Sequence, residues 1–307
     1  MPDAAVLESA WPGARIQEMV AIPESHSGFT YMVTALVEGT LVEGVLRVPP
    51  PGARPVGPAD VVRQGRIMAA LSEAGVPVPR VLAMGEEPPF LVMERVAGVR
   101  VEEALAAASA RALISAAFAA ARRLHEVPLA RTGIGEEPVM APGEEVRRWQ
   151  ALRVRAPEEL LRGAERLEER LLSALPALRP PALVHGDFHL GNLLFQGSRV
   201  VAILDWEIAE MGSPPLDEAA LCLLAIRAPF GEPQPGAEAA LPLEEMVSLA
   251  DAGPDFDWYL AATSHKYAAI LGYNLGLHRR GRRIDPVYEQ LLRTIPGLVD
   301  AGLQLVG

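Results

Sequence analysis

Cysteine is almost absent from this chain of 307 residues, since Cys222 is the only one. A single cysteine excludes an internal disulfide, and its place in the apolar segment LDEAALCLLAI predicts a buried, unreactive thiol. This usage is typical of a reducing, cytoplasmic setting. Long apolar runs are also missing: none approaches the ~18 residues that span a bilayer. The N-terminal residues lack a basic region followed by an apolar core, so we expect neither a secretory signal nor a membrane partner.

Basic residues are in the minority, with 28 lysines and arginines against 39 acidic residues and a net charge of −11. This balance argues against nucleic acid as a partner. It is compatible with cationic ligands, although many acidic enzymes bind none, so net charge alone decides little. Half of the residues are hydrophobic, which indicates a globular protein. The length is sufficient for two lobes that each have a core.

The first part of the chain has the pattern of a small antiparallel sheet with one helix. Runs rich in Val, Leu, Thr and Tyr predict strands, and an apolar stripe predicts a helix that follows the stop PPPG. The expected strands are 29–37, 41–48, 79–84 and 90–94, and the expected helix is 60–74. We find no internal repeat.

After Val96-Ala97-Gly98 the pattern changes to Ala-rich and Leu-rich helical segments, which Gly and Pro clusters separate. The expected helices are 101–126, 144–151, 157–174, 216–228, 243–250, 257–278 and 286–305. The sequence therefore predicts an α+β fold in two parts. Residues 1–95 would form a small lobe with the sheet and one helix, and residues 96–307 a larger, mostly helical lobe.

The most informative segment is LVHGDFHLGNLLFQGSRVVAILDWE, from Leu183 to Glu207. Its two apolar runs, with the turn Gln-Gly-Ser-Arg between them, predict a short β-hairpin. Folding this hairpin would return Asp205 towards the loop that carries Asp187 and Asn192. These three side chains are hard oxygen donors of the kind that Mg²⁺ prefers. An acidic, solvated hairpin would explain Asp187 alone, but not an apolar strand that ends on Asp205.

HGDFHLGN followed by ILDWE resembles the catalytic segment of the aminoglycoside phosphotransferase family, which includes choline kinase-like members. The resemblance implies a two-lobed fold of the protein-kinase type and an enzyme that uses ATP and Mg²⁺. It further implies that Asp187 accepts or orients the proton of a hydroxyl on a small-molecule acceptor. Asn192 and Asp205 would hold Mg²⁺ at the ATP phosphates.

The same resemblance assigns nucleotide contacts in the small lobe. Backbone amides near Ser27 and Gly28 would reach the phosphates, although an ordinary hairpin turn would have the same composition. The segment FLVMERVAG resembles the family's hinge, so the carbonyl of Glu94 and the amide of Val96 would bind the adenine. Leu91 and Met93 would line its pocket, as they would a buried edge strand.

Two positions depart from the family pattern. Kinases of this fold use a strand lysine held by a helix glutamate, whereas this chain has Arg47 and Gln64 there. Arginine keeps the charge and can bind phosphate, but it is not interchangeable with lysine. Arginine also occurs at this position in the branch fused to acyl-CoA dehydrogenases, which this chain resembles. Asp60 could support Arg47 electrostatically or could simply cap the helix.

Other polar residues have competing interpretations. His185 and His189 have the spacing of metal ligands, but Gly186 and Gly191 indicate a loop, so we interpret both as loop-structuring residues. His185 is expected to bond to the backbone near Asp205. We expect structural roles for His125, at a helix end, and for Asp217, which would cap a helix and brace the catalytic loop.

The acceptor site is less clear from the sequence. The basic cluster at 278–283, His-Arg-Arg-Gly-Arg-Arg, could receive an anionic acceptor or could be a solvated loop. Side chains of the preceding helix could line the acceptor site or belong to the core; these are Trp258, Tyr259, His265, Lys266, Tyr267 and Tyr273.

Three functions compete at this stage. The first is an ATP- and Mg²⁺-dependent phosphotransferase for a small-molecule hydroxyl. The second is a nucleotide-binding pseudokinase with a regulatory role, which Gln64 favours and the intact Asp187, Asn192 and Asp205 oppose. The third is a protein kinase, which the short segment after Asp205 disfavours because it leaves little room for an activation loop.

Overall fold

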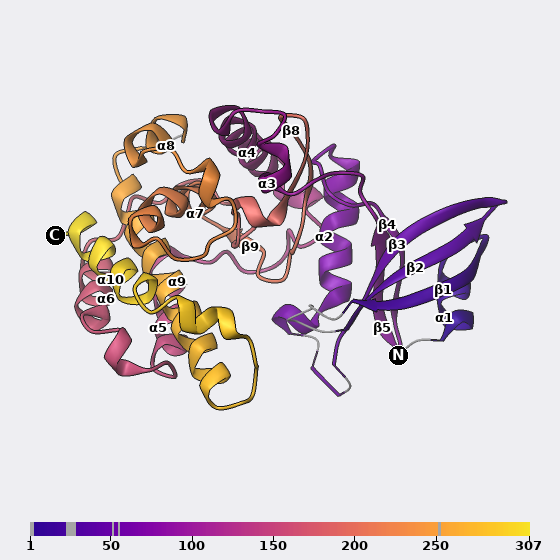
Figure 1. Cartoon of the computed structure of the whole chain (residues 1–307), viewed down its shortest axis with the longest axis horizontal. Helices are drawn as coiled ribbons and strands as arrows, with labels where there is room; N and C mark the ends of the chain where they lie inside the picture. Colours follow the sequence, from indigo (N-terminus) through magenta and orange to yellow (C-terminus); the bar gives the residue numbers. More distant parts are fainter. Residues whose placement is uncertain (1–2, 23–28, 51, 55, 251–252) are drawn as a thin grey trace.

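The computed structural model describes residues 3–22, 29–50, 52–54, 56–250 and 253–307. Figure 1 shows the strands of an antiparallel sheet at the N-terminal end of the molecule and most of the helices at the other end, with α2 between them. The sheet has the order β1-β2-β3-β5-β4. Its strands are β1 (Ala14–Ile22), β2 (Phe29–Val37), β3 (Thr40–Val48), β4 (Val81–Glu86) and β5 (Pro89–Glu94).

One face of the sheet packs on a short helix, α1 (Ala4–Ala10). Leu7 and Trp11 from this segment are buried against Val33, Leu46 and Phe90 of the sheet. Neither α1 nor β1 was predicted from the sequence. The strand signal of β1 is weak because a register shift between Ile16 and Glu18 interrupts the alternation of side chains.

The other face of the sheet packs on α2 (Val61–Glu73). The helix begins where the Asp60 carboxylate accepts a hydrogen bond from the Arg63 amide at 2.9 Å, so Asp60 is an N-cap. Gly65 allows close packing, because a Cβ there would lie 3.0 Å from Leu91. Arg63 then ties α2 to the helical part through Glu137, at 2.6 Å, and through the carbonyl of Ala209, at 2.9 Å.

The rest of the chain is mostly helical and forms one continuous apolar core with α2. The helix α9 (Phe256–Arg279) lies at its centre, and most of its first half is buried. Around it lie α5 (Pro142–Arg153), α6 (Ala164–Ser173), α7 (Pro215–Arg227) and α10 (Thr294–Leu305). The remaining helices are α3 (Val101–Ala104), α4 (Ala110–His125) and α8 (Leu243–Leu249). Burial also raises the pKa of the Cys222 thiol in α7, as expected of an unreactive cysteine.

Several predicted helices are shorter or divided. The segment 101–126 forms α3 and α4, because Ser109 caps a new helix within it. The segment 286–305 is a 3-10 turn, Pro286–Gln290, followed by α10. The segment 157–174 is α-helical only from Ala164, where α6 begins. Within the described ranges, no helix is both long and apolar enough to cross a membrane.

The predicted hairpin is present as β7 (Leu193–Gln196) and β8 (Arg199–Ile203). A second short pair, β6 (Ala182–Val184) with β9 (Glu210–Gly212), holds the two ends of the motif together. The expected α+β fold, a small antiparallel sheet followed by a larger helical part, is therefore confirmed, although the sheet packs on two helices and not on one.

The N-cap of α2 gives a first prediction. Asp60→Ala should lower the free energy of unfolding by about 1 kcal/mol, because the Arg63 amide loses its acceptor. Asp60→Asn keeps an oxygen at the cap and should restore most of that loss. Denaturant unfolding of the three proteins measures both effects, and an asparagine variant as unstable as the alanine variant would contradict the capping role.

Candidate active site

One buried carboxylate, that of Asp217, holds the loop that carries Asp187. Asp217, in the first turn of α7, accepts hydrogen bonds from the amides of His185, at 2.8 Å, and Gly186, at 2.9 Å. It also bonds to the His125 ring at 2.9 Å. Gly186 has a φ of +82°, and a Cβ there would lie 2.7 Å from the Ile208 carbonyl, so only glycine fits. The bracing role expected of Asp217 and the structural role expected of His125 are confirmed. The expectation that Asp217 caps a helix is wrong, because α7 has no side-chain cap and the Asp217 carboxylate faces the loop instead.

His185 connects the two halves of the motif. Its Nδ1 accepts from the Asp187 amide at 3.1 Å, which leaves Nε2 to donate to the Leu204 carbonyl at 2.8 Å. The ring is fully buried, and burial lowers its pKa, so the neutral form with this pattern of donors is favoured. The predicted bond from His185 to the backbone near Asp205 is confirmed.

Asn192 lies beside Asp187. Its side-chain amide nitrogen donates to the Asp187 carbonyl at 2.9 Å and to the Asp187 carboxylate at 3.2 Å. Its own carbonyl accepts from the Leu204 amide at 2.8 Å, so Asn192 lies next to the residue before Asp205. With the nitrogen facing Asp187, the side-chain oxygen remains as an acceptor or as a metal ligand.

Asp205 adopts a left-handed conformation, with a φ of +67°. An aspartate tolerates this region better than most residues, and such positions are common at functional sites. One of its oxygens lies 3.3 Å from Arg47, whose guanidinium also bonds to Glu207. Arg47 and Glu207 expose only 13% and 14% of their side chains, so solvent screens this pair little.

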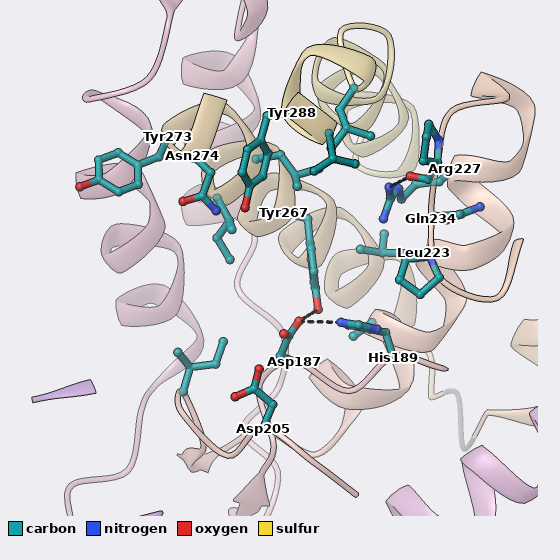
Figure 2. Close-up of a pocket in the computed structure, with 18 of the residues that line it drawn as sticks. Asp187, His189, Asp205, Leu223, Arg227, Gln234, Tyr267, Tyr273, Asn274 and Tyr288 are labelled. Atoms are coloured by element: carbon teal, nitrogen blue, oxygen red, sulfur yellow. Dashed lines mark hydrogen bonds and ion pairs between the residues drawn. The ribbon is translucent and has the colours of Figure 1, made fainter. Parts of the chain in front are cut away.

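The Asp187 carboxylate is ionised in this setting. Burial alone would raise its pKa, but the charge of His189, whose ring nitrogen lies 3.6 Å from the carboxylate, and the hydrogen bond from Tyr267 outweigh burial and lower it. Tyr267 donates its hydroxyl to the same carboxylate oxygen that faces His189, as Figure 2 shows. His189 also orders the loop by accepting from the Gly191 amide at 3.1 Å, as predicted.

Two cavities meet at Asp205. One, of about 640 Å³, lies between the sheet and the hairpin, and its lining includes Arg47, Gln64 and Asp205. The other, of about 570 Å³, lies in the helical part, and Asp187 and Tyr267 belong to its lining. Asp205 lines both cavities. A group placed at Asp205 could therefore contact a molecule in either one.

The cavity beside the sheet contains most of the residues predicted for nucleotide binding. Arg47, Met93, Glu94 and Val96 all line it. Leu91 does not: it lies on the same face of β5 as Met93, but α2 covers it and buries it fully. Ser27 and Gly28 lie outside the described residues.

The second cavity receives only part of the predicted acceptor residues. Tyr267 and Tyr273 line it, whereas Trp258, Tyr259, His265 and Lys266 are buried in the core. Within the basic cluster, Arg283 lines the cavity and Arg280 and Arg282 are exposed. The sequence interpretation missed Glu207 and Arg227, which also line this cavity. Glu207 follows Asp205 by two residues, which was an available signal, but Arg227 had none.

Lys266 is the only lysine of the chain, and it supports the catalytic loop. Its ammonium donates to the Gly186 carbonyl, lies 3.7 Å from Glu145 and lies 4.9 Å from the centre of the Trp149 ring. Glu210 completes this buried group through Arg148. Burial and the negative charge of Glu145 raise the pKa of Glu210 from 4.5 to about 7.

The residues can be tested against a metal ion. Among the described residues, no three His, Cys, Asp or Glu side chains gather in a way that could hold a metal by themselves. Asp205, which lines both cavities, instead offers one carboxylate, and Asn192, which lies beside Asp187 and lines neither cavity, offers one amide oxygen. This set fits Mg²⁺, which commonly takes one or two carboxylates and completes its shell with phosphate oxygens and water.

A family model and several known proteins match the sequence of this chain. A family model described as "Phosphotransferase enzyme family" matches residues 19–252. Acyl-CoA dehydrogenase family member 10 of Mus musculus is 33% identical over 220 residues, which is 67% of this chain and 20% of that protein. Viomycin phosphotransferase of Streptomyces vinaceus is 31% identical over 204 residues, 60% of this chain and 66% of that protein. The chain spans only about a fifth to two fifths of the acyl-CoA dehydrogenase relatives.

Solved structures share the fold over almost the whole chain. A candidate aminoglycoside phosphotransferase from Ralstonia eutropha has a TM-score of 0.74 at 21% identity, covering 98% of this chain and 94% of that one. A thermostable mutant aminoglycoside phosphotransferase, solved with AMP-PNP and hygromycin B, has a TM-score of 0.65 at 17% identity, covering 94% and 95%. At these identities the likeness establishes the fold alone.

The raised pKa of Glu210 predicts a pH dependence. The folded state holds this proton more tightly than the unfolded chain, so the stabilisation is complete below about pH 4.5 and is lost as the pH rises to about 7. Across this window the wild type should lose up to about 3 kcal/mol of unfolding free energy relative to Glu210→Gln. Denaturant unfolding at several pH values measures the difference.

Glu169→Gln, at an exposed position of α6, serves as the matched control for the Glu210 measurement and should parallel the wild type. A Glu210→Gln variant that also parallels the wild type from pH 4 to 8 would show that Glu210 titrates normally.

Proposed function

Because the chain belongs to the phosphotransferase enzyme family, we propose that it transfers the γ-phosphate of ATP to a hydroxyl of a small molecule. The observation that carries this proposal is the meeting of the two cavities at Asp205. One cavity would hold the nucleotide and the other the acceptor, so the γ-phosphate and the hydroxyl would meet beside Asp187. Residues 1–95 would cover the nucleotide, and residues 96–307 would supply the catalytic loop and the acceptor site.

The nucleotide would be held by residues of the first cavity. Backbone groups of Glu94 and Val96 would bind the adenine, and Arg47 would bind phosphate oxygens with its planar guanidinium. In the structure Arg47 forms ion pairs with Asp205 and Glu207. With nucleotide bound, the ion pair with Glu207 would orient the guanidinium towards the phosphates, and Asp205 would bind the metal instead of Arg47. The predicted phosphate contacts near Ser27 and Gly28 remain part of this proposal.

Asn192 and Asp205 would hold Mg²⁺, which when bound neutralises charge that develops on the phosphates. Asp187 would orient the acceptor hydroxyl and receive its proton as the oxygen attacks the γ-phosphorus. Its low pKa makes it a weak base, so orientation would contribute more than proton removal before the transition state. The Tyr267 hydroxyl and Asn192 fix the carboxylate for this role.

Nucleotide binding is the first test of this function. Calorimetric titration of ATP into the wild type should give binding that requires Mg²⁺. Asp205→Asn should weaken Mg²⁺-dependent binding by about tenfold or more, because a carboxylate ligand becomes a neutral amide. Glu169→Gln, which is distant from both cavities, is the control. Absence of binding to the wild type would instead favour a kinase-shaped protein with a different role.

Transfer itself is the second test. Asp187→Asn preserves size and the hydrogen bond from Tyr267 but removes the proton acceptor, so kcat should fall by at least about 100-fold. ATP affinity should change little, because Asp187 does not line the nucleotide cavity. ADP release with a panel of small alcohols measures kcat, and calorimetry measures affinity. Undiminished transfer by the Asp187→Asn protein would remove Asp187 from the mechanism.

A further inference from the structure

The end of the acceptor cavity away from Asp187 has a positive charge that forms an ion pair with no carboxylate of the described residues. Arg227, the last residue of α7, lines this cavity. Its guanidinium donates to the Pro233 carbonyl at 3.1 Å. Its Nε is buried and has no hydrogen-bond partner in the structure. Among the ion pairs of the described part of the chain, none includes Arg227.

Such a charge is unfavourable unless something binds it. Burial disfavours the charged form and lowers the pKa of Arg227, while Tyr267 and Glu232 offset only part of this effect. The carboxylate of Glu232 is itself committed to the amides of Arg293, at 2.8 Å, and Thr294, at 2.7 Å. A half-buried arginine without an ion pair, in the wall of a cavity, is a ready site for an oxyanion.

Distance along the cavity separates this charge from the catalytic carboxylate. Figure 2 shows Asp187 and Asp205 at one end and Arg227 with Gln234 away from them, and the ring of Tyr267 lies between. A second arginine, Arg283, lines the same cavity and donates to the Asn274 side chain at 3.1 Å. The acids of the lining, Asp187, Asp205 and Glu207, all come from the catalytic segment.

The wall between the two ends is mixed. Aliphatic side chains of α7 and α9 form much of it, among them Leu221, Leu223, Leu224, Ile270 and Leu271, and Tyr273, Asn274 and Tyr288 add polar groups. The cavity thus has carboxylates at one end, a largely aliphatic middle and arginine at the other end. A polycationic acceptor would meet repulsion at Arg227.

We propose that the acceptor is an amphiphilic anion: a hydroxyl on an apolar carbon skeleton, with a carboxylate or phosphate group that Arg227 binds and Arg283 attracts. This proposal rests on the proposed phosphoryl transfer and adds the chemical class of the acceptor. The hydroxyl lies at Asp187, the skeleton contacts the leucines, and the anionic group lies against the guanidinium of Arg227.

Binding without nucleotide gives the first arm of the test. The probes are straight chains of about four to ten carbons that end in a carboxylate, a phosphate, a neutral alcohol or an amine, and calorimetry measures their affinity. The wild type should bind an anionic chain at least about tenfold more tightly than the matched alcohol, and the amine least of all. Comparing carboxylate with phosphate identifies which anion the site prefers.

Variants assign the preference to the site. Arg227→Met keeps the aliphatic volume and should reduce the preference for the anion to about twofold or less. Arg227→Lys keeps a charge and should retain part of the preference. Arg283→Met measures the contribution of the second arginine to the anion preference without altering α7. Arg282→Met is the matched control, since Arg282 is exposed, belongs to the same basic segment and does not line the cavity; its preference should equal that of the wild type.

Turnover gives the second arm, with ATP and the corresponding chains that carry a hydroxyl at the other end. The anionic acceptor should have the highest kcat/KM, and Arg227→Met should raise its KM more than it lowers kcat, because the contact is remote from the reacting atoms. If no chain length favours the anion, or if Arg227→Met keeps the preference, the proposal is wrong. Anion preference in a protein that does not bind Mg²⁺ and ATP would instead sink the proposed phosphotransferase and leave the anion site standing.

Discussion

The buried carboxylate of Asp217 is the constraint on which the geometry of the site depends. It accepts hydrogen bonds from the amides of His185 and Gly186 and forms a hydrogen bond with the His125 ring. Burial would raise its pKa, but the hydrogen bond and charge of His125 lower it, so the carboxylate stays ionised and keeps both amides as donors. His185 transmits this arrangement by bonding to Asp187 on one side and Leu204 on the other. The positions of Asp187 and Asp205 are therefore set by one network and not by two independent loops.

The pairing of Arg47 gives a physical reason for the neutral Gln64. In related kinases a helix glutamate holds the phosphate-binding lysine, whereas here the carboxylates of Glu207 and Asp205 contact the arginine. A glutamate at position 64, where the side chain is 2% exposed, would add a buried carboxylate to the lining of the cavity that also holds Arg47. Burying an extra charge without a partner is costly. Gln64 therefore fits a site in which the counter-charge has moved to the catalytic segment, and its presence alone does not favour a pseudokinase.

Local patterns in the sequence predicted much of the fold but none of the long-range pairing. The hairpins and α2 follow from alternation, helical stripes and turn residues that lie close in sequence, whereas the roles expected of Asp187, Asn192 and Asp205 come from the resemblance to a family. The strand β1 was missed because a bulge interrupts its alternation. Residues 286–305 were predicted as one helix, although the structure has a 3-10 turn that ends at Gln290 and a helix that begins at Thr294. Arg47 and Glu207 are 160 residues apart, and no local pattern could predict that they meet.

The same limit applies to charge. The net charge of −11 was compatible with a cationic acceptor, yet a ligand in a cavity responds to the charges that line it more than to those screened by solvent on the surface. Within the cavity proposed for the acceptor, the acids belong to the segment 183–207, where Arg47 and a bound metal would balance them, and the arginines lie elsewhere. A basic cluster that is mostly solvated can therefore still contribute one residue, Arg283, to the site. The sequence located the cluster, but only the fold distinguishes the arginine that lines the cavity from those that face water.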